Sequence, residues 1–141
     1  MWRKTVGTGG QGGGIWTNTN TMNIGSTSTV SANLASGQYS QGGALYSAGG
    51  TVTIDNSALT ANKATGTGSV SGGIYNSGGS YTITNSTITG NRSPTAPAPG
   101  GVYTTVAINP TVAINPTGTT ITGNTPTNCL LSPAAVTPCT N

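Results

Sequence analysis

The sequence predicts an all-β protein, a parallel β-helix (β-solenoid) of about four turns, and two recurring features are the main reason. In each repeat, a glycine-rich step is followed by an apolar residue and then an aromatic residue, and the aromatic residues recur at intervals of 30, 29 and 28 residues. A tetrapeptide that ends in asparagine also recurs, at intervals of 29, 29 and 33 residues. The aromatic residues are Trp16, Tyr46, Tyr75 and Tyr103, and the asparagines are Asn33, Asn62, Asn91 and Asn124. A period in this range, with short strands between Gly-, Asn- and Ser-rich turns, is typical of stacked repeat arrays.

The composition supports this fold class. The chain has 141 residues, enough for one domain with a modest core. Only 4% of the residues are charged and 23 are glycine, a balance also found in disordered chains, but such chains lack a regular apolar pattern. Here residues 51–55 and 80–84 alternate polar and apolar side chains with the period of two that half-buried strands show.

Three segments follow from these patterns. Residues 1–12 are expected to form a loose N-terminal segment or a partial cap, because Trp2, Arg3 and Lys4 are followed by a Gly-rich stretch. Residues 13–124 hold the β-helix repeats, with three short strands per unit, and residues 125–141 form a Pro-rich C-terminal cap. The chain contains neither the hydrophobic region of a signal peptide nor a transmembrane stretch, so we expect no membrane insertion and a leader absent from this chain.

Equivalent residues of successive turns should stack at the strand spacing of about 4.8 Å. We therefore expect inward aliphatic columns, a stack of the four aromatic side chains, and a ladder of the four asparagines. The aliphatic columns are Ile24, Ile54 and Ile83, and Val30, Leu59, Ile88 and Ile121. An asparagine amide can donate to and accept from the same amide one turn away, and asparagine also tolerates the left-handed backbone that we expect at this corner.

The fourth unit contains an insertion. Residues 105–110 and 111–116 are the same hexapeptide, Thr-Val-Ala-Ile-Asn-Pro, written twice. Because Pro110 and Pro116 would interrupt strand pairing, we expect the extra copy to bulge out as a loop.

Two cysteines, Cys129 and Cys139, lie close to the C-terminus. With no histidine in the chain they make a poor metal site, and no metal or cofactor is expected. A disulfide between them would close the C-terminal cap over the last turn and would indicate an oxidising compartment.

Residues 72–91, Gly-Gly-Ile-Tyr-Asn-Ser-Gly-Gly-Ser-Tyr-Thr-Ile-Thr-Asn-Ser-Thr-Ile-Thr-Gly-Asn, resemble the repeats of right-handed parallel β-helix proteins of the pectin-lyase-like superfamily. More narrowly, they are similar to the Gly-Gly-aromatic and Ile-Thr-Asn-Ser repeats of bacterial secreted proteins akin to polymorphic outer membrane proteins. The resemblance spans residues 13–124 and implies a right-handed solenoid. It implies little about activity, because the superfamily carries lyases, hydrolases and adhesins on one scaffold.

Enzymatic members of that superfamily use carboxylates, which this chain almost lacks. Asp55 is its only acidic side chain, and it has no histidine. A glycosidase of the usual kind needs two carboxyl groups, and a calcium site needs several oxygen ligands. We therefore expect no catalytic residues and no enzyme activity, with a degenerate or partial polysaccharide lyase or hydrolase domain as the alternative.

Lys63 and Arg92 each directly follow a ladder asparagine and should lie one turn apart on the same corner. They form either a solvated pair that discourages aggregation or a small basic site for an acidic glycan. A net charge of +3 is too small for a nucleic-acid interface, so no nucleic-acid partner is expected.

Outward threonines raise a second binding hypothesis. Stacking would place Thr53 over Thr82 and Thr60 over Thr89, an arrangement that resembles the Thr arrays of ice-binding solenoids. The alternative is that threonine simply suits the outer face of a strand. The array is interrupted in the first unit, where Asn23 and Ser31 occupy the matching positions.

These observations predict a non-enzymatic β-solenoid, secreted or on a bacterial cell surface, with a structural, adhesive or glycan-contacting role. Its expected partners are an extracellular or cell-surface polysaccharide and, through an uncapped N-terminal end of the solenoid, a second copy of itself. Ice binding is the alternative among binding functions.

Overall fold

The computed structural model describes residues 3–94, 98–105, 118–129, 136 and 139. These residues form a parallel β-solenoid of about four turns, in which every paired strand runs parallel to its partner in the next turn. The predicted all-β class, the stacked turns and their number are confirmed.

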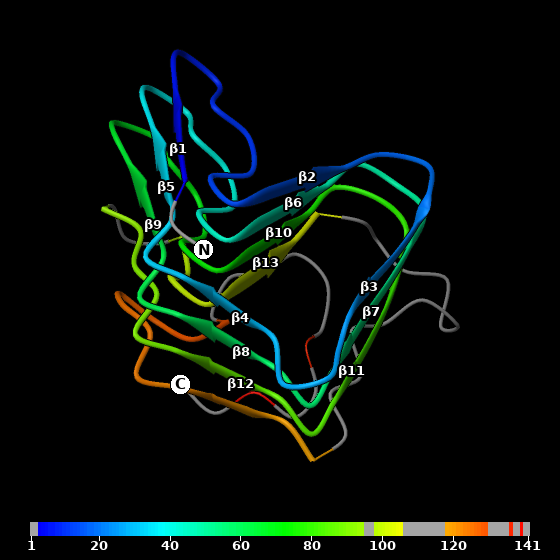
Figure 1. The fold of residues 1–141 in the computed structure, drawn as a ribbon. Helices are drawn as coiled ribbons and strands as arrows, with labels where there is room; N and C mark the ends of the chain where they lie inside the picture. The colour runs from blue at the N-terminus through cyan, green and yellow to red at the C-terminus, as the bar shows by residue number, and fades with distance from the viewer. Residues whose placement is uncertain (1–2, 95–97, 106–117, 130–135, 137–138, 140–141) are drawn as a thin grey trace.

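Three sheets enclose the core and follow one another around each turn (Figure 1). The first contains β2 (Ile15–Thr17), β6 (Leu45–Ser47), β10 (Ile74–Asn76) and β13 (Val102–Thr104). The second contains β3 (Thr21–Ile24), β7 (Thr51–Asp55) and β11 (Ser80–Thr84). The third contains β4 (Thr29–Ser31), β8 (Ala58–Thr60), β12 (Thr87–Thr89) and β14 (Thr120–Thr122).

A fourth sheet projects from one corner of the solenoid, and the prediction of three strands per unit missed it (Figure 1). It consists of β1 (Lys4–Val6), β5 (Leu34–Ser36) and β9 (Lys63–Thr65). These strands have only Ala35 and Ala64 as their fully buried side chains, so they lack the large apolar residues that mark the other strands. We call this sheet the arm.

The arm also changes the description of residues 1–12, which the sequence analysis left without a strand. β1 pairs with β5 in register, Lys4 opposite Leu34, so the segment contributes a strand to the solenoid. The glycines that follow continue the pairing, since Gly7 and Gly9 donate to carbonyls in the next turn.

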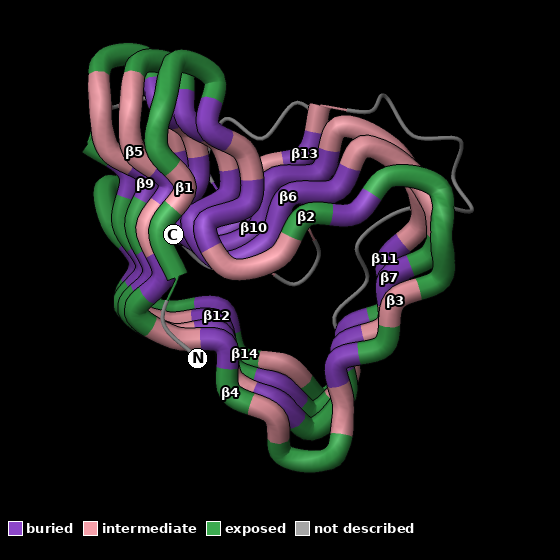
Figure 2. Tube along the Cα trace, turned by 45° about the horizontal axis from the view of Figure 1, so that its top comes forward, coloured by how far each residue is buried: buried purple, intermediate pink, exposed green. Residues whose placement is uncertain are grey.

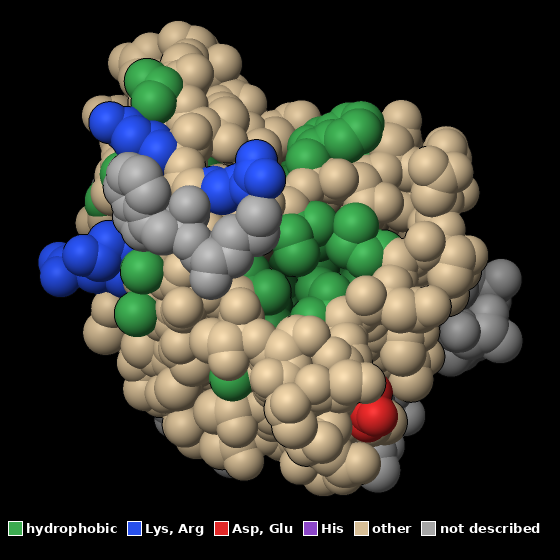
Figure 3. Space-filling model, in the orientation of Figure 1, with side chains coloured by type: hydrophobic (Ala, Val, Ile, Leu, Met, Phe, Trp, Pro, Cys, Tyr) green, Lys and Arg blue, Asp and Glu red, His purple; other side chains and the backbone are tan. Residues whose placement is uncertain are grey.

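The expected aliphatic columns form the core. Figure 2 shows buried positions that recur in successive turns of each sheet. Ile54 and Ile83 are fully buried above Ile24, and Leu59, Ile88 and Ile121 are buried above Val30. A third inward column consists of Leu45, Ile74 and Val102. At the end of the solenoid that carries β2 and β3, Ile15 and Met22 are only partly buried, and hydrophobic side chains are visible there (Figure 3). Self-association through this end stays a prediction.

The insertion does not disturb the fourth turn where the structure describes it. β14 pairs with β12 in register, with Ile121 opposite Ile88. The duplicated hexapeptide itself lies outside the described residues, apart from Thr105, so the expected loop stays a prediction. The predicted disulfide between Cys129 and Cys139 is confirmed, and both side chains pack with Val136 against the hydrophobic core.

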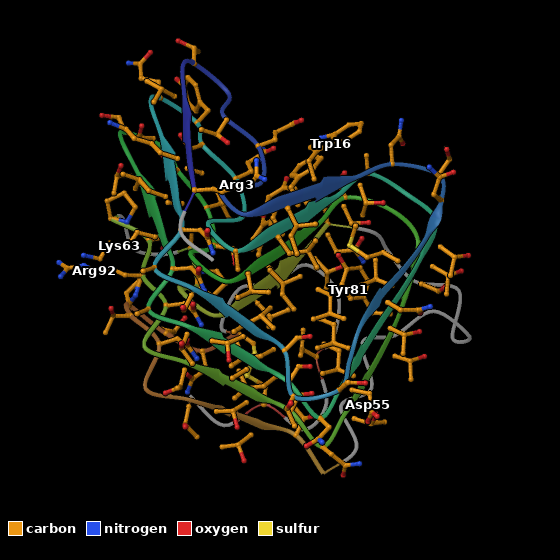
Figure 4. The ribbon with its side chains drawn as sticks, in the orientation of Figure 1. Arg3, Trp16, Asp55, Lys63, Tyr81 and Arg92 are labelled. Atoms are coloured by element: carbon orange, nitrogen blue, oxygen red, sulfur yellow. A yellow bond between two sulfur atoms is a disulfide. The ribbon has the colours of Figure 1, made fainter. Side chains whose placement is uncertain are left out.

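Tyr81 occupies an inward position next to Val52, and its hydroxyl makes no hydrogen bond with the described residues (Figure 4). Burial raises the pKa of Tyr81 far above the ordinary value of 10.0. The nearby Ser47 side chain lowers that pKa by a smaller amount.

We expect the Tyr81→Phe variant to be about 1 kcal/mol more stable than the wild type, since it removes a buried hydroxyl without a partner. In the wild type, the folded-state pKa of Tyr81 is raised above the unfolded-state value of 10.0. Ionisation of Tyr81 therefore costs no stability below pH 10.0, and the free energy of unfolding falls as the pH rises beyond that value. Urea unfolding between pH 7 and pH 11.5, roughly the range over which tyrosine ionises, should show this loss in the wild type and less of it in Tyr81→Phe. Tyr39→Phe, at a residue 58% exposed, is the matched control and should behave like the wild type. The prediction is contradicted if the free energy of unfolding changes equally with pH in all three proteins.

Candidate functional site

The asparagine ladder forms as predicted and is structural. The Asn33, Asn62 and Asn91 amides each donate to the side-chain oxygen of the next asparagine at 2.9 Å, and their backbone N–H groups donate to the same oxygen at 3.0 Å. Asn128 extends the ladder beyond Asn124. Because these asparagines are buried and, apart from the Asn33 side-chain oxygen, their side chains are hydrogen-bonded, we interpret the ladder as structural.

The expected left-handed backbone at this corner belongs to a different residue. The positive φ angles occur at the residue before each ladder asparagine: 55° at Ala32 and Ala61, 64° at Gly90 and 61° at Gly123. The ladder asparagines themselves are not among the residues with positive φ. Asn56 and Asn85, at another corner, are the asparagines that adopt positive φ.

A second ladder of hydroxyl groups was not foreseen. The Ser57 N–H donates to the Ser86 hydroxyl at 3.1 Å, and the Ser86 N–H donates to the Thr119 hydroxyl at 3.2 Å. The recurring Asn-Ser step after the strands is the sequence signal that could have indicated it.

Three of the four aromatic residues, the tyrosines, stack in register on the outer face of the first sheet. The ring centroids of Tyr46 and Tyr75 are 5.5 Å apart, and those of Tyr75 and Tyr103 are 5.3 Å apart. Burial raises the pKa of Tyr75, and the neighbouring Tyr103 and Tyr46 raise it further. Trp16 lies in register with Tyr46 but is 52% exposed, whereas Tyr46 and Tyr75 are 7% and 8% exposed.

Lys63 and Arg92 are neighbours across two turns of the arm, as expected from their positions after ladder asparagines. They pair as a parallel bridge, both are exposed, and they line a cavity of about 320 Å³ together with Ala64, Thr65 and Pro94. Figure 4 shows both side chains pointing away from the solenoid on the same side. Asp55, the only acidic side chain of the protein, lies at a distant corner and accepts a hydrogen bond from Thr84, so it neutralises neither cation.

Lys4 belongs to the same register column, which the sequence analysis missed. The column runs Lys4, Leu34, Lys63, Arg92, Thr125 through successive turns. Three of the four lysines and arginines of the protein therefore share one edge of the arm. The signal was available, since Lys4 precedes Leu34 by one repeat period.

The threonine columns form where the register predicted them. Thr53 pairs with Thr82, and Thr60 pairs with Thr89. The third sheet carries the more regular array, with two outward columns that span four turns. They are Thr29, Ala58, Thr87 and Thr120, and Ser31, Thr60, Thr89 and Thr122.

No group of three or more histidine, cysteine or acidic residues that could hold a metal occurs among the described residues. Within the same part of the chain, no helix is long and apolar enough to cross a membrane. Comparisons with protein-family models, with curated proteins and with solved structures find no match to this chain. The class that the fold defines is a parallel β-solenoid.

Proposed function

We propose that this protein is a non-enzymatic β-solenoid of an extracellular or bacterial cell-surface setting that contacts an anionic polysaccharide through Lys63 and Arg92. The finer assignment, to right-handed pectin-lyase-like solenoids with polymorphic outer membrane protein-type repeats, belongs to the same proposal. It is supported by the repeat motif of residues 72–91 and by the parallel register of successive turns.

The observation that carries this proposal is the pairing of two exposed cations with no side-chain carboxylate near them. Lys63 and Arg92 occupy directly opposite positions on adjacent strands, about 4.8 Å apart at the backbone. Like charges at such positions repel each other. An anionic group bound at this corner would remove the repulsion and add charge-assisted hydrogen bonds, and Arg92 could bind a carboxylate through two parallel contacts.

A polymer suits this corner better than a small molecule. The cavity is shallow enough to leave both cations exposed, so a single anion would gain little against competing water and salt. A polysaccharide that carries a charge on successive sugars can contact Lys63, Arg92 and Lys4 at once, because these residues share one register column.

We expect the double variant Lys63→Gln/Arg92→Gln to bind polygalacturonate about tenfold more weakly than the wild type, because two exposed charge contacts are lost. Affinity electrophoresis or calorimetry at low and high salt measures this, and wild-type binding should fall as salt rises. The charge-conserving variant Lys63→Arg/Arg92→Lys should retain most of the affinity. Asp55→Asn, which alters only the distant corner, should not weaken binding. The proposal fails if the folded double variant binds like the wild type, or if neutral dextran binds as well as polygalacturonate.

Ice binding is a second candidate, and one observation favours it. The outward columns of the third sheet present seven hydroxyl side chains and Ala58 in a regular two-by-four array that includes the fourth turn. A regular hydroxyl array at fixed strand spacing could order water on its surface. Thermal hysteresis of the purified protein separates this function from glycan contact, which produces none.

A further inference from the structure

A second groove lies between the arm and the first sheet, on the opposite side of the arm from Lys63 and Arg92 (Figure 4). It encloses about 460 Å³ and is lined by Arg3, Lys4, Thr5, Gln11, Trp16 and the glycines of residues 12–14. The three glycines contribute no side chains to this lining. Gly13 has no room for one, since an added Cβ would lie 2.4 Å from the Gly43 carbonyl oxygen. The groove therefore combines an aromatic ring, an amide and the Arg3 guanidinium around open space.

Trp16 is held in place although half of its surface is exposed. Its indole N–H donates to the Gln11 side-chain oxygen at 3.2 Å, and the Gln11 amide donates to the Gln41 side-chain oxygen at 3.4 Å. β2 is the terminal strand of its sheet, so Tyr46 of the next turn is the only aromatic neighbour of Trp16 in the described register. An indole that is already ordered loses little conformational entropy when a ligand stacks on its free face.

Arg3 supplies the charge. Its guanidinium group is exposed, and Figure 4 places it beside Trp16 within the groove. A planar guanidinium binds a carboxylate through two parallel hydrogen bonds. A ligand for this groove needs a flat C–H surface that stacks on the indole and a carboxylate that binds the guanidinium. The pyranose ring of a uronic acid provides both.

We propose that this groove binds a uronic acid residue, with Trp16 stacking on the sugar ring, Arg3 holding the carboxylate, and Gln11 orienting the indole. The site is separate from the Lys63–Arg92 corner, because the two lie on opposite sides of the arm. It would give the solenoid a contact that recognises an individual sugar, whereas the corner responds to polymer charge.

The test uses the full chain with Trp2→Phe, which leaves Trp16 as the only tryptophan. Titration with trigalacturonate should produce a saturable change in tryptophan emission as the indole leaves water. Galactotriose, which lacks the carboxylates, should bind at least tenfold more weakly, and Arg3→Gln should abolish that preference while leaving the circular dichroism spectrum unchanged. The indole N–H resonance of Trp16 in the wild-type protein gives the same readout without the Trp2 substitution.

The Lys63→Gln/Arg92→Gln variant separates this site from the proposed polysaccharide corner. The Trp16 response to trigalacturonate should be unchanged in that variant, even where its affinity for polygalacturonate has fallen. Absence of any saturable response would overturn the proposal, as would equal affinity for galactotriose. Loss of the response in the Lys63→Gln/Arg92→Gln variant would also overturn it, because the groove would then not be an independent site.

Discussion

Replacing Gly72 by alanine is expected to destabilise the solenoid by about 3 kcal/mol, because the added methyl group has no room. A Cβ at Gly72 would lie 2.3 Å from both the backbone nitrogen and the backbone oxygen of Arg92. Neither contact is with a flexible side chain, so relief requires the backbone at Arg92, which pairs with the arm at Lys63, to move away from the segment that leads into β10. Gly43, one turn earlier, is just as tightly enclosed by the Gly72 and Lys63 carbonyls, which shows that the close approach repeats along the solenoid.

Urea denaturation followed by circular dichroism measures this effect, and Gly25→Ala is the matched control. A Cβ at Gly25 would meet only the Asp55 carbonyl oxygen, at 3.9 Å, so its stability should change by no more than about 0.5 kcal/mol. A Gly72→Ala protein that unfolds at the same urea concentration as Gly25→Ala would show that the arm and the first sheet do not pack as described.

Asn62→Ala is expected to cost about 4 kcal/mol of unfolding free energy. The Asn62 side chain takes part in four buried hydrogen bonds: it accepts from the Asn33 N–H and amide and donates to the Val30 carbonyl and to Asn91. Truncation leaves several of these buried groups without partners, at about 1–3 kcal/mol each. The individual costs do not add fully, since the neighbouring asparagines can shift.

Asn33→Ala tests the same ladder at its end. The Asn33 side chain donates one hydrogen bond, to Asn62, and its oxygen has no partner among the described residues. We therefore expect a loss of only about 1 kcal/mol at this position. Thermal and urea unfolding of both variants should rank Asn62→Ala well below Asn33→Ala, and equal losses would mean that the ladder does not act as a continuous chain of hydrogen bonds.

The repeat period and the alternation of side chains were enough to predict the core. Residues that differ by one period, such as Ile54 and Ile83, stack because each turn must lay its strands on the previous one. The same reasoning predicted the asparagine ladder and the position of Lys63 beside Arg92. It failed at the arm, where Ala35 and Ala64 are too small to produce a recognisable apolar pattern.

The two candidate binding sites differ in how far they could be predicted. The Lys63–Arg92 corner follows from sequence spacing alone, because both residues directly follow a ladder asparagine. The groove at Trp16 does not, because its residues come from the arm and from the first sheet, which the sequence analysis did not bring together. Even the aromatic stack was predicted without indicating that Trp16 keeps half of its surface exposed while Tyr46 and Tyr75 are buried.

The sequence by itself determined the period, the inward columns, the asparagine ladder and the disulfide pair, since each depends on local spacing that repeats along the chain. Only the tertiary structure decided the strands of the arm, the residues that take the left-handed backbone and the groove beside the arm. These features depend on how closely one stretch of backbone approaches another, as at Gly72 and Arg92. A glycine in the sequence indicates that such a position needs a small residue, but it does not identify the backbone segment that packs against it.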